Sequence, residues 1–241
     1  MDNFRSDESM KELIYRFGSE IIASSPLMRI PRFANAFEKK VWGRKLDVHY
    51  NFDMLSASSE REYLFNIASN LKKNSNILEI GTYRGGFTLF LSKGAEISKS
   101  KVYSIDPFDI CPERQLCESD GSFFCTSSLR KPSLEEVKRN LTSNGVNGNM
   151  ELIQGFSLEV SHHWNRPNID FLFIDGNHKQ AKQDYLSWRP HLNQGALVAF
   201  HDSNHPYYGR QDVTEDVSFL RDKGHLKLLD RHHSISLLAS K

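Results

Sequence analysis

The stretch NILEIGTYRGGFT, residues 76–88, decides the fold class. It opens with a short apolar run typical of a buried strand, turns at Gly81, and starts a helical pattern at Gly86. Its Gly-x-x-x-Gly spacing differs from the Gly-x-Gly-x-x-Gly of dinucleotide-binding turns, and it lacks the lysine of a phosphate-binding loop. The stretch therefore predicts a strand–turn–helix unit whose backbone can approach a ligand closely at the turn.

Apolar runs alternate with helical patterns along the rest of the chain. Strands are predicted at 76–81, 101–106, 150–155, 169–176 and 195–202, and helices at 58–72, 86–97, 133–145, 177–192 and 212–223. Two closing runs, 226–231 and 234–240, predict a terminal hairpin. This order predicts an α/β fold, a doubly wound Rossmann-like sheet that is mostly parallel, with helices on both faces and one antiparallel strand.

We expect two parts of the chain. Residues 1–57 form an N-terminal helical or cap segment, in which residues 8–23 carry a helical stripe of apolar side chains. Residues 58–241 form the main domain, with an insertion loop at 107–132.

Composition excludes several classes of function. The 241 residues include 31 Lys and Arg against 30 Asp and Glu, so no global field draws in nucleic acid or an anionic membrane. No apolar run approaches the length of a membrane span, and the charged N-terminus does not resemble a secretory signal, so we expect a cytoplasmic protein. The cysteines lack a Cys-x-x-Cys pair, which favours thiols packed in a loop over a metal site or a disulfide framework: Cys111, Cys117 and Cys125.

Acidic residues stand where the predicted strands end. Glu79, Asp106, Asp175 and Asp202 each close one strand, and the carboxyl ends of parallel strands meet at the edge where ligands bind. Core packing does not require carboxylates there, so their convergence predicts a binding site. Asp106, after the second strand, can accept both hydroxyls of a ribose, although a solvated strand-end carboxylate needs no ligand.

The segments EIGTYRGGFT, SIDPFD and FLFIDGNHKQAKQDYLSWRPHLNQGALVAFHDS together resemble a class I S-adenosylmethionine-dependent methyltransferase, over roughly residues 58–240. Within that superfamily they are similar to small O-methyltransferases of the catechol, sugar and macrolide types. The resemblance implies a seven-stranded sheet whose last strand is antiparallel, and S-adenosyl-L-methionine as the cofactor. It places Glu79 and Gly81 along the methionine part, Asp106 on the ribose and the turn 155–157 near the adenine. The expected cofactor-binding residues are Glu79, Gly81, Thr82, Tyr83, Gly85, Asp106, Ser157 and Asp175.

The same resemblance implies a metal site where the methyl group would be transferred. Asp175 and Asp202 end neighbouring strands, and two carboxylates suit Mg²⁺. His201 departs from the pattern of the metal-dependent relatives, and an imidazole ligand would shift the preference towards Mn²⁺ and similar ions. We predict a site for Mg²⁺ or Mn²⁺ on Asp175, His201 and Asp202, with a metal-free site as the open alternative.

His178 and Asp175 are the predicted catalytic residues. His178 matches the position of a basic catalytic side chain in catechol-type relatives, and a helix N-terminus would keep its imidazole neutral and able to accept a proton. A helix-capping or packing histidine is the alternative. The loop that follows Asp202 carries side chains able to hold a sugar ring or an anionic group, unless it is a plain surface loop: His205, Tyr207, Tyr208 and Arg210.

The sequence thus predicts methyl transfer to a hydroxyl oxygen of a small molecule, a sugar or a phenolic natural product. A metal-independent N- or C-methyltransferase and an inactive nucleoside-binding partner protein stay open. A nicotinamide-dependent dehydrogenase is disfavoured by the glycine spacing. We expect a small-molecule acceptor and neither nucleic acid nor membrane as partners, and a homodimer through the N-terminal helices stays open.

Overall fold

Seven strands form the central sheet of the computed structural model, which describes residues 56–110, 131–146 and 148–241. The strand order is β3-β2-β1-β4-β5-β9-β8. Strands β1 to β5 run parallel, and β9 is antiparallel to both of its neighbours. The strands are β1 (Asn76–Ile80), β2 (Lys101–Asp106), β3 (Met150–Gln154), β4 (Ile169–Ile174), β5 (Leu192–Phe200), β8 (Leu226–His232) and β9 (Ile235–Ser240). The predicted doubly wound sheet, its antiparallel last strand and the terminal hairpin are confirmed.

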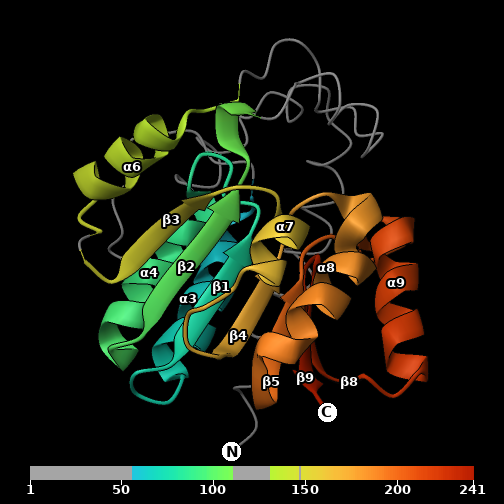
Figure 1. Ribbon diagram of the computed structural model, residues 1–241. Helices are drawn as coiled ribbons and strands as arrows, with labels where there is room; N and C mark the ends of the chain where they lie inside the picture. Colours follow the sequence, from blue (N-terminus) through green and yellow to red (C-terminus); the bar gives the residue numbers. More distant parts are fainter. Residues whose placement is uncertain (1–55, 111–130, 147) are drawn as a thin grey trace, which may run out of the picture.

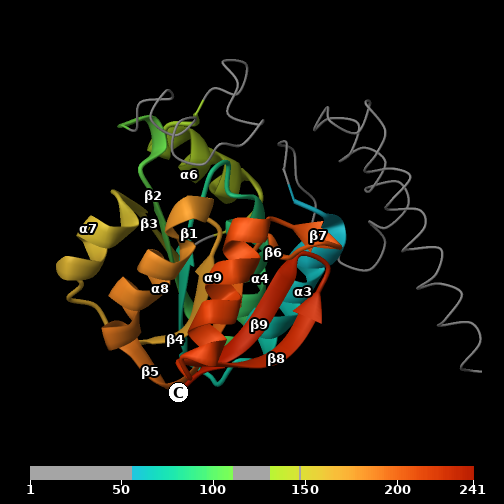
Figure 2. The same ribbon diagram turned by 90° about the vertical axis from the view of Figure 1, so that its right-hand side faces the viewer.

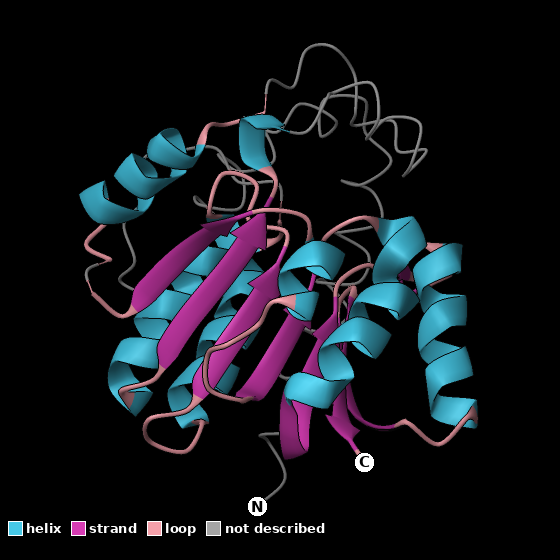
Figure 3. Ribbon diagram, in the orientation of Figure 1, coloured by secondary structure: helices cyan, strands magenta, loops and turns pink. Residues whose placement is uncertain are grey.

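Helices cover both faces of this sheet (Figures 1 and 3). They are α3 (Ser58–Asn70), α4 (Gly86–Ser98), α6 (Leu134–Ser143), α7 (Ser157–His162), α8 (Ala181–Trp188) and α9 (Gln211–Asp222). Buried side chains of α3 and α4 pack on one face of the sheet, and those of α8 and α9 pack on the other. Side chains alternate between faces along a strand, so Ile77 and Phe171 face α3 and α4, whereas Leu78 and Leu172 face α8 and α9.

Some predicted elements differ from the structure. The helix expected over 177–192 is divided into a 3₁₀ turn (His178–Gln180), α8 and a second 3₁₀ turn (Arg189–His191). Pro190 accounts for the end of α8, because proline cannot donate a helical hydrogen bond and restricts the residue before it. Helix α7 and the hairpin of β6 (Ser203–Asn204) and β7 (Tyr208–Gly209) were not predicted, since such short elements show no periodicity.

Several predictions lie outside the described residues. These are the helical stripe at 8–23, nearly all of the N-terminal segment and the three cysteines. The insertion loop begins with a 3₁₀ turn at Phe108–Ile110, and its residues 111–130 are not described. Across the described ranges, no helix combines the length and the apolar character that crossing a membrane requires.

Candidate active site

The predicted site residues gather at the carboxyl ends of the parallel strands, at the arrowheads in Figure 1. The chain runs from β1 outward to β2 and β3 on one side, and from β4 outward to β5 on the other. The crevice between β1 and β4 is therefore the topological switch point, where open α/β sheets bind their ligands.

Gly81 allows two strands to approach each other at this point. Its φ is +96°, and a Cβ added there would lie 2.2 Å from the carbonyl oxygen of Asp175. The N–H of Gly81 donates to Ile105 over 2.9 Å, and the N–H of Asp175 donates to Ile80 over 2.8 Å. Glycine is required here both for its backbone conformation and for the space.

Glu79 carries a buried carboxyl group with one oxygen left for a ligand. Its Oε2 accepts hydrogen bonds from the Thr88 hydroxyl, over 2.5 Å, and from the Ser104 hydroxyl. Its Oε1 is buried and has no hydrogen-bond partner in the described part of the chain. Burial, only partly offset by those hydrogen bonds, raises the pKa of Glu79 to about 8. A donor or a cation placed at Oε1 would stabilise the ionised form.

The turn after β1 is shaped by three of the predicted cofactor residues. The buried Thr82 hydroxyl lies 2.6 Å from that of Ser104. Tyr83 has a φ of +45° and donates its N–H to Oδ2 of Asp106 over 2.9 Å. Gly85, with a φ of +89°, is the N-cap residue of α4. The structure brings these residues together around the predicted ligand position.

Asp106 and Ser157 differ in what they leave free. Each carboxylate oxygen of Asp106 accepts one backbone N–H, from Tyr83 and, over 2.7 Å, from Phe108. Because a carboxylate oxygen can accept a second hydrogen bond, Asp106 remains able to hold hydroxyl groups. The Ser157 hydroxyl instead accepts from the indole N–H of Trp188 over 2.9 Å, within the core. The predicted cofactor contact of Ser157 therefore stays a prediction.

The predicted catalytic and metal-binding residues form one charged cluster. His201 lies at its centre: its Nδ1 is 2.8 Å from Oδ1 of Asp175 and 3.7 Å from Oδ2 of Asp202. Its other nitrogen, Nε2, is 3.3 Å from Oε2 of Glu60, a residue of α3. His178 closes the cluster, with its Nε2 3.3 Å from Oδ2 of Asp202.

Electrostatics favour a charged His201. Burial opposes the charge, but Asp175, Asp202 and Glu60 together raise the pKa of His201 well above its ordinary value. The pKa of Asp202 is lowered, because His201 and His178 outweigh the effect of burial. The ring therefore lies between carboxylates on both sides, with Asp175 and Asp202 near Nδ1 and Glu60 near Nε2.

The predicted metal ligands lie close together without forming a recognisable metal site. Asp175 and Asp202 both lie beside Nδ1 of His201, at 2.8 Å and 3.7 Å. No three His, Cys, Asp or Glu side chains of the described ranges are placed to hold a metal ion.

His178 begins the 3₁₀ turn His178–Gln180, which leads directly into α8, so the helix predicted to start here opens with a 3₁₀ turn. Asn177 caps that turn through its side chain, which accepts from the N–H of Lys179. With Nε2 donating towards Asp202, the lone pair stays on Nδ1, which is buried and has no hydrogen-bond partner in the described ranges. That nitrogen is the atom available to accept a proton.

The hairpin β6–β7 fixes the backbone of Asp202. Asp202 has a φ of +52°, uncommon for a residue with a side chain. Its carbonyl accepts from the N–H of Arg210 over 2.7 Å, and a Cβ on Gly209 would lie 2.4 Å from that carbonyl. The loop side chains are partly engaged: Tyr208 stacks on His233 at 4.0 Å and Arg210 pairs with Asp212 at 3.0 Å.

Three residues of this cluster were missed by sequence reasoning: Glu60, His233 and Ser234. His233 and Ser234 form the turn between β8 and β9, and Figure 2 shows the first turn of α3 beside the hairpin β6–β7. These segments are more than 140 positions apart from Glu60 in the sequence, and no local pattern links them. The one sequence feature that could have pointed to them was the pair His232–His233 at the predicted hairpin turn.

Comparisons with known proteins agree with this fold. Residues 78–203, more than half of the chain, match the family described as "Methyltransferase domain". The O-methyltransferase NovP is similar with a TM-score of 0.63 and 17% identity, covering 79% of this chain and 83% of that one. TomG of Streptomyces achromogenes, an O-methyltransferase of tomaymycin synthesis in complex with SAM, gives a TM-score of 0.60 and 16% identity over 88% and 99%. The SAH-bound methyltransferase PaMTH1 of Podospora anserina gives 0.58 and 14% over 87% and 94%.

The fold is an α/β domain whose candidate ligand site lies at the switch point of its sheet. The chain belongs to the methyltransferase-domain family, which confirms the class recognised from the sequence.

Proposed function

We propose that the protein transfers the methyl group of S-adenosylmethionine to a hydroxyl oxygen of a small-molecule acceptor. The observation that carries this proposal is the buried Glu79, with an unpaired Oε1, beside the close approach of Gly81 and Asp175 at the switch point. A buried polar oxygen without a partner is costly unless a ligand supplies one. The O-methyltransferase neighbours that were solved with SAM or SAH support this cofactor and this acceptor class.

The reaction needs alignment and removal of one proton. The acceptor oxygen forms a bond to the methyl carbon while the bond from that carbon to sulfur breaks, so the sulfonium leaves as a neutral thioether. The hydroxyl proton passes to Nδ1 of His178, and Asp202, 3.3 Å from Nε2, orients the ring and stabilises its charge. Holding the two reactants in line contributes several kcal/mol, of the order of 5. The backbone of Asp175 lies against Gly81, while its carboxylate lies 2.8 Å from Nδ1 of His201.

His178→Ala tests the base. We expect kcat to fall by about 10²–10⁴-fold with the affinity for S-adenosylhomocysteine unchanged, because the side chain acts on the acceptor. Formation of S-adenosylhomocysteine is followed with catechol, simple phenol and sugar acceptors. His163→Ala, an exposed histidine after α7, is the matched control. Full turnover by His178→Ala would remove the base assignment.

Metal assistance is a separate question, since the described side chains include no group of three or more placed to hold a metal ion. The mechanism above uses none, and the prediction of Mg²⁺ or Mn²⁺ on Asp175, His201 and Asp202 is tested by chelation. We expect dialysis against EDTA, followed by either ion, to leave kcat within about twofold. A loss on chelation that Mn²⁺ restores would establish the predicted site.

Partners and location are proposed on composition alone. A net charge of +1 supports a small-molecule acceptor over nucleic acid or a membrane surface, and a cytoplasmic location agrees with the predicted free thiols. Light scattering of the purified protein distinguishes a monomer from the homodimer that stays open.

A further inference from the structure

Glu60 is a carboxylate with an unusual number of partners for a residue at the start of a helix. Only 2% of it is exposed, and it lies outside residues 78–203, which match the family. Both of its carboxylate oxygens face hydrogen-bond donors from other residues, as an ionised carboxylate requires. A buried, ionised carboxylate is stable only when hydrogen-bond donors surround it.

Within the described ranges, every hydrogen bond of the two oxygens is with a donor. Oε1 accepts from Nδ1 of His233 over 2.8 Å, from the backbone N–H of Ser234 over 3.2 Å, and from the Ser234 hydroxyl. Oε2 accepts from the N–H of Ala57 over 3.2 Å and from Nε2 of His201 over 3.3 Å. One carboxylate thus ties the start of α3 to the end of β5 and to the turn between β8 and β9.

The bond to His201 determines how that ring faces the site. Because an ionised carboxylate can only accept, Nε2 must carry a hydrogen and Nδ1 must point the other way, towards Asp175 and Asp202. The edge of the ring also packs against Phe87, with ring centroids 5.1 Å apart. Packing alone does not distinguish the two nitrogens, whereas the carboxylate does.

We propose that Glu60 is a positioning residue of this active site: it fixes the orientation of His201 and, through that ring, the placement of the Asp175 and Asp202 carboxylates. The expected effect on turnover rests on the proposed function. The orientation of the His201 ring by Glu60 does not. It assigns to α3, a helix before the matched family segment, a part in assembling the catalytic cluster.

The test compares Glu60→Gln with Glu62→Gln, the same change on the same helix at a carboxylate that takes no part in these hydrogen bonds. In Glu60→Gln one oxygen becomes an NH₂ group and the charge is lost, so the His201 N–H faces either a second donor or a neutral oxygen that accepts more weakly. The ring N–H signal of His201, assigned by its loss in His201→Asn, is followed by ¹⁵N-edited NMR. We expect it to shift or vanish in Glu60→Gln and to persist in Glu62→Gln.

Turnover supplies a second readout, with 3,4-dihydroxybenzoate as the acceptor. We expect Glu60→Gln to lower kcat about tenfold or more, with KM for S-adenosylmethionine within about twofold, because misplaced groups slow the chemical step. In the His201→Asn background the same change should have no further effect, since Glu60 acts through that ring. Should Glu60→Gln fail to fold, Glu60→Asp, which keeps the charge but shortens the reach, takes its place.

Two results would overturn the inference: an unchanged His201 ring signal in the Glu60 variant, or losses in kcat that multiply when both residues are changed. A wild-type protein that binds no S-adenosylhomocysteine would end the proposed function and leave the ring signal to decide the role of Glu60.

Discussion

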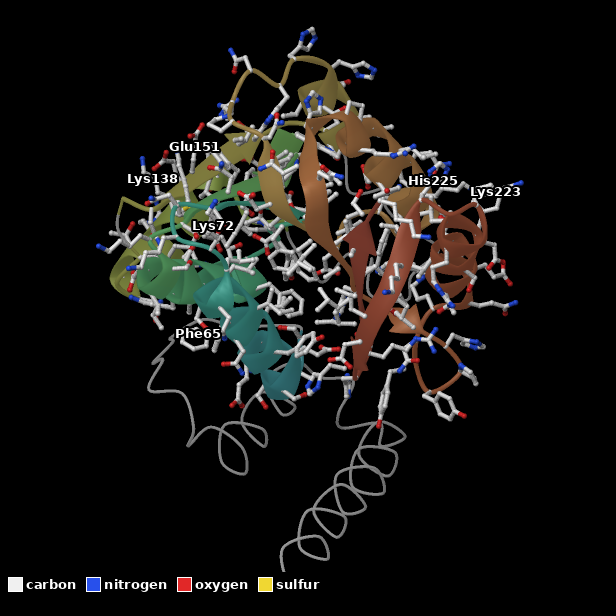
Figure 4. The ribbon with its side chains drawn as sticks, turned by 90° about the horizontal axis from the view of Figure 1, so that it is seen from below. Phe65, Lys72, Lys138, Glu151, Lys223 and His225 are labelled. Carbon is white, nitrogen blue, oxygen red and sulfur yellow. The ribbon has the colours of Figure 1, made fainter. Side chains whose placement is uncertain are left out.

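Glu60 and Glu151 are both glutamates that pair with two basic side chains. They differ in how far their side chains are exposed to solvent. Glu151 lies on β3 and pairs with Lys101 at 2.9 Å and with Arg166 at 2.7 Å, while Glu60 pairs with two histidines. Viewed from below, Figure 4 shows Glu151 on one flank of the molecule, with His225 and Lys223 on the other. The Glu151 side chain is 34% exposed, whereas that of Glu60 is 3% exposed. Solvent screens the first group of charges, while the second depends on complete pairing.

The largest expected difference is in the free energy of unfolding. Glu60→Leu should cost about 3–5 kcal/mol, because it removes a buried carboxylate from two partly buried histidines. Glu151→Leu should cost less than about 1 kcal/mol, the usual contribution of an exposed pair. Urea unfolding monitored by circular dichroism measures both losses. Equal losses would show that burial does not separate the two sites.

A pair of glycines tests the carboxyl edge of the sheet in the same way. Gly81→Ala should cost about 2–4 kcal/mol of stability, for two reasons. The new Cβ would collide with the Asp175 carbonyl, and the φ of +96° is unfavourable for alanine. Gly195, early in β5, has a φ of +74° but nothing within 4 Å, so Gly195→Ala should cost only about 1 kcal/mol. Thermal unfolding of both variants separates close approach from backbone strain. Of the two variants, we expect only Gly81→Ala to lose affinity for S-adenosylhomocysteine. If Gly81→Ala were as stable as Gly195→Ala, the close approach of Gly81 to Asp175 would be refuted.

Glu79 predicts a pH dependence of stability with a definite sign. Its pKa is raised to about 8 in the folded protein, from an ordinary value of 4.5, so the folded state holds a proton that the unfolded state releases. The stabilisation is complete below pH 4.5 and is lost as the pH rises through 8. Between pH 6 and pH 8.5 the titration of Glu79 should lower the free energy of unfolding of the ligand-free protein by about 2–3 kcal/mol. The quantity to measure is the difference in unfolding free energy between wild type and Glu79→Gln at both pH values; a constant difference would contradict the shifted pKa.

The smallest expected effect concerns salt. Glu151→Gln should cost about 0.5 kcal/mol at low ionic strength and almost nothing in 1 M NaCl, because exposed charges are screened within a few ångströms. The cost of Glu60→Gln should change little over the same range, since its partners are buried. Denaturation at the two salt concentrations checks this, and a salt-dependent loss at Glu60 would place that carboxylate in contact with solvent.

The sheet was predictable from the sequence because its strands are short, apolar and separated by helices. The apolar runs at 169–176 and 195–202 became β4 and β5, and their terminal residues Asp175 and Asp202 meet at one edge, as the parallel arrangement requires. Ser133 caps α6 by accepting the N–H of Glu136, as its position before that helix indicated.

The cluster around His201 could not be predicted in the same way. Its Glu60 contact joins residues 141 positions apart, and only the packing of α3 against the sheet brings them together. The sequence placed His201 beside two acids and suggested a metal ligand, whereas the third carboxylate, on α3, makes the ring a partner in ion pairs. The hydroxyl of Ser157 likewise accepts a hydrogen bond from Trp188, a contact that depends on side-chain packing and not on a local sequence pattern.

The central claim is that the edge of the sheet around Glu79 and Gly81 binds S-adenosylmethionine. Calorimetric titration of the purified protein with S-adenosylhomocysteine tests it most directly. We predict one site per chain with a dissociation constant of about 1–100 μM, corresponding to about −8 to −5.5 kcal/mol, both with and without EDTA. No measurable heat in any condition, for a protein shown to be folded, would contradict the cofactor assignment and the mechanism built on it.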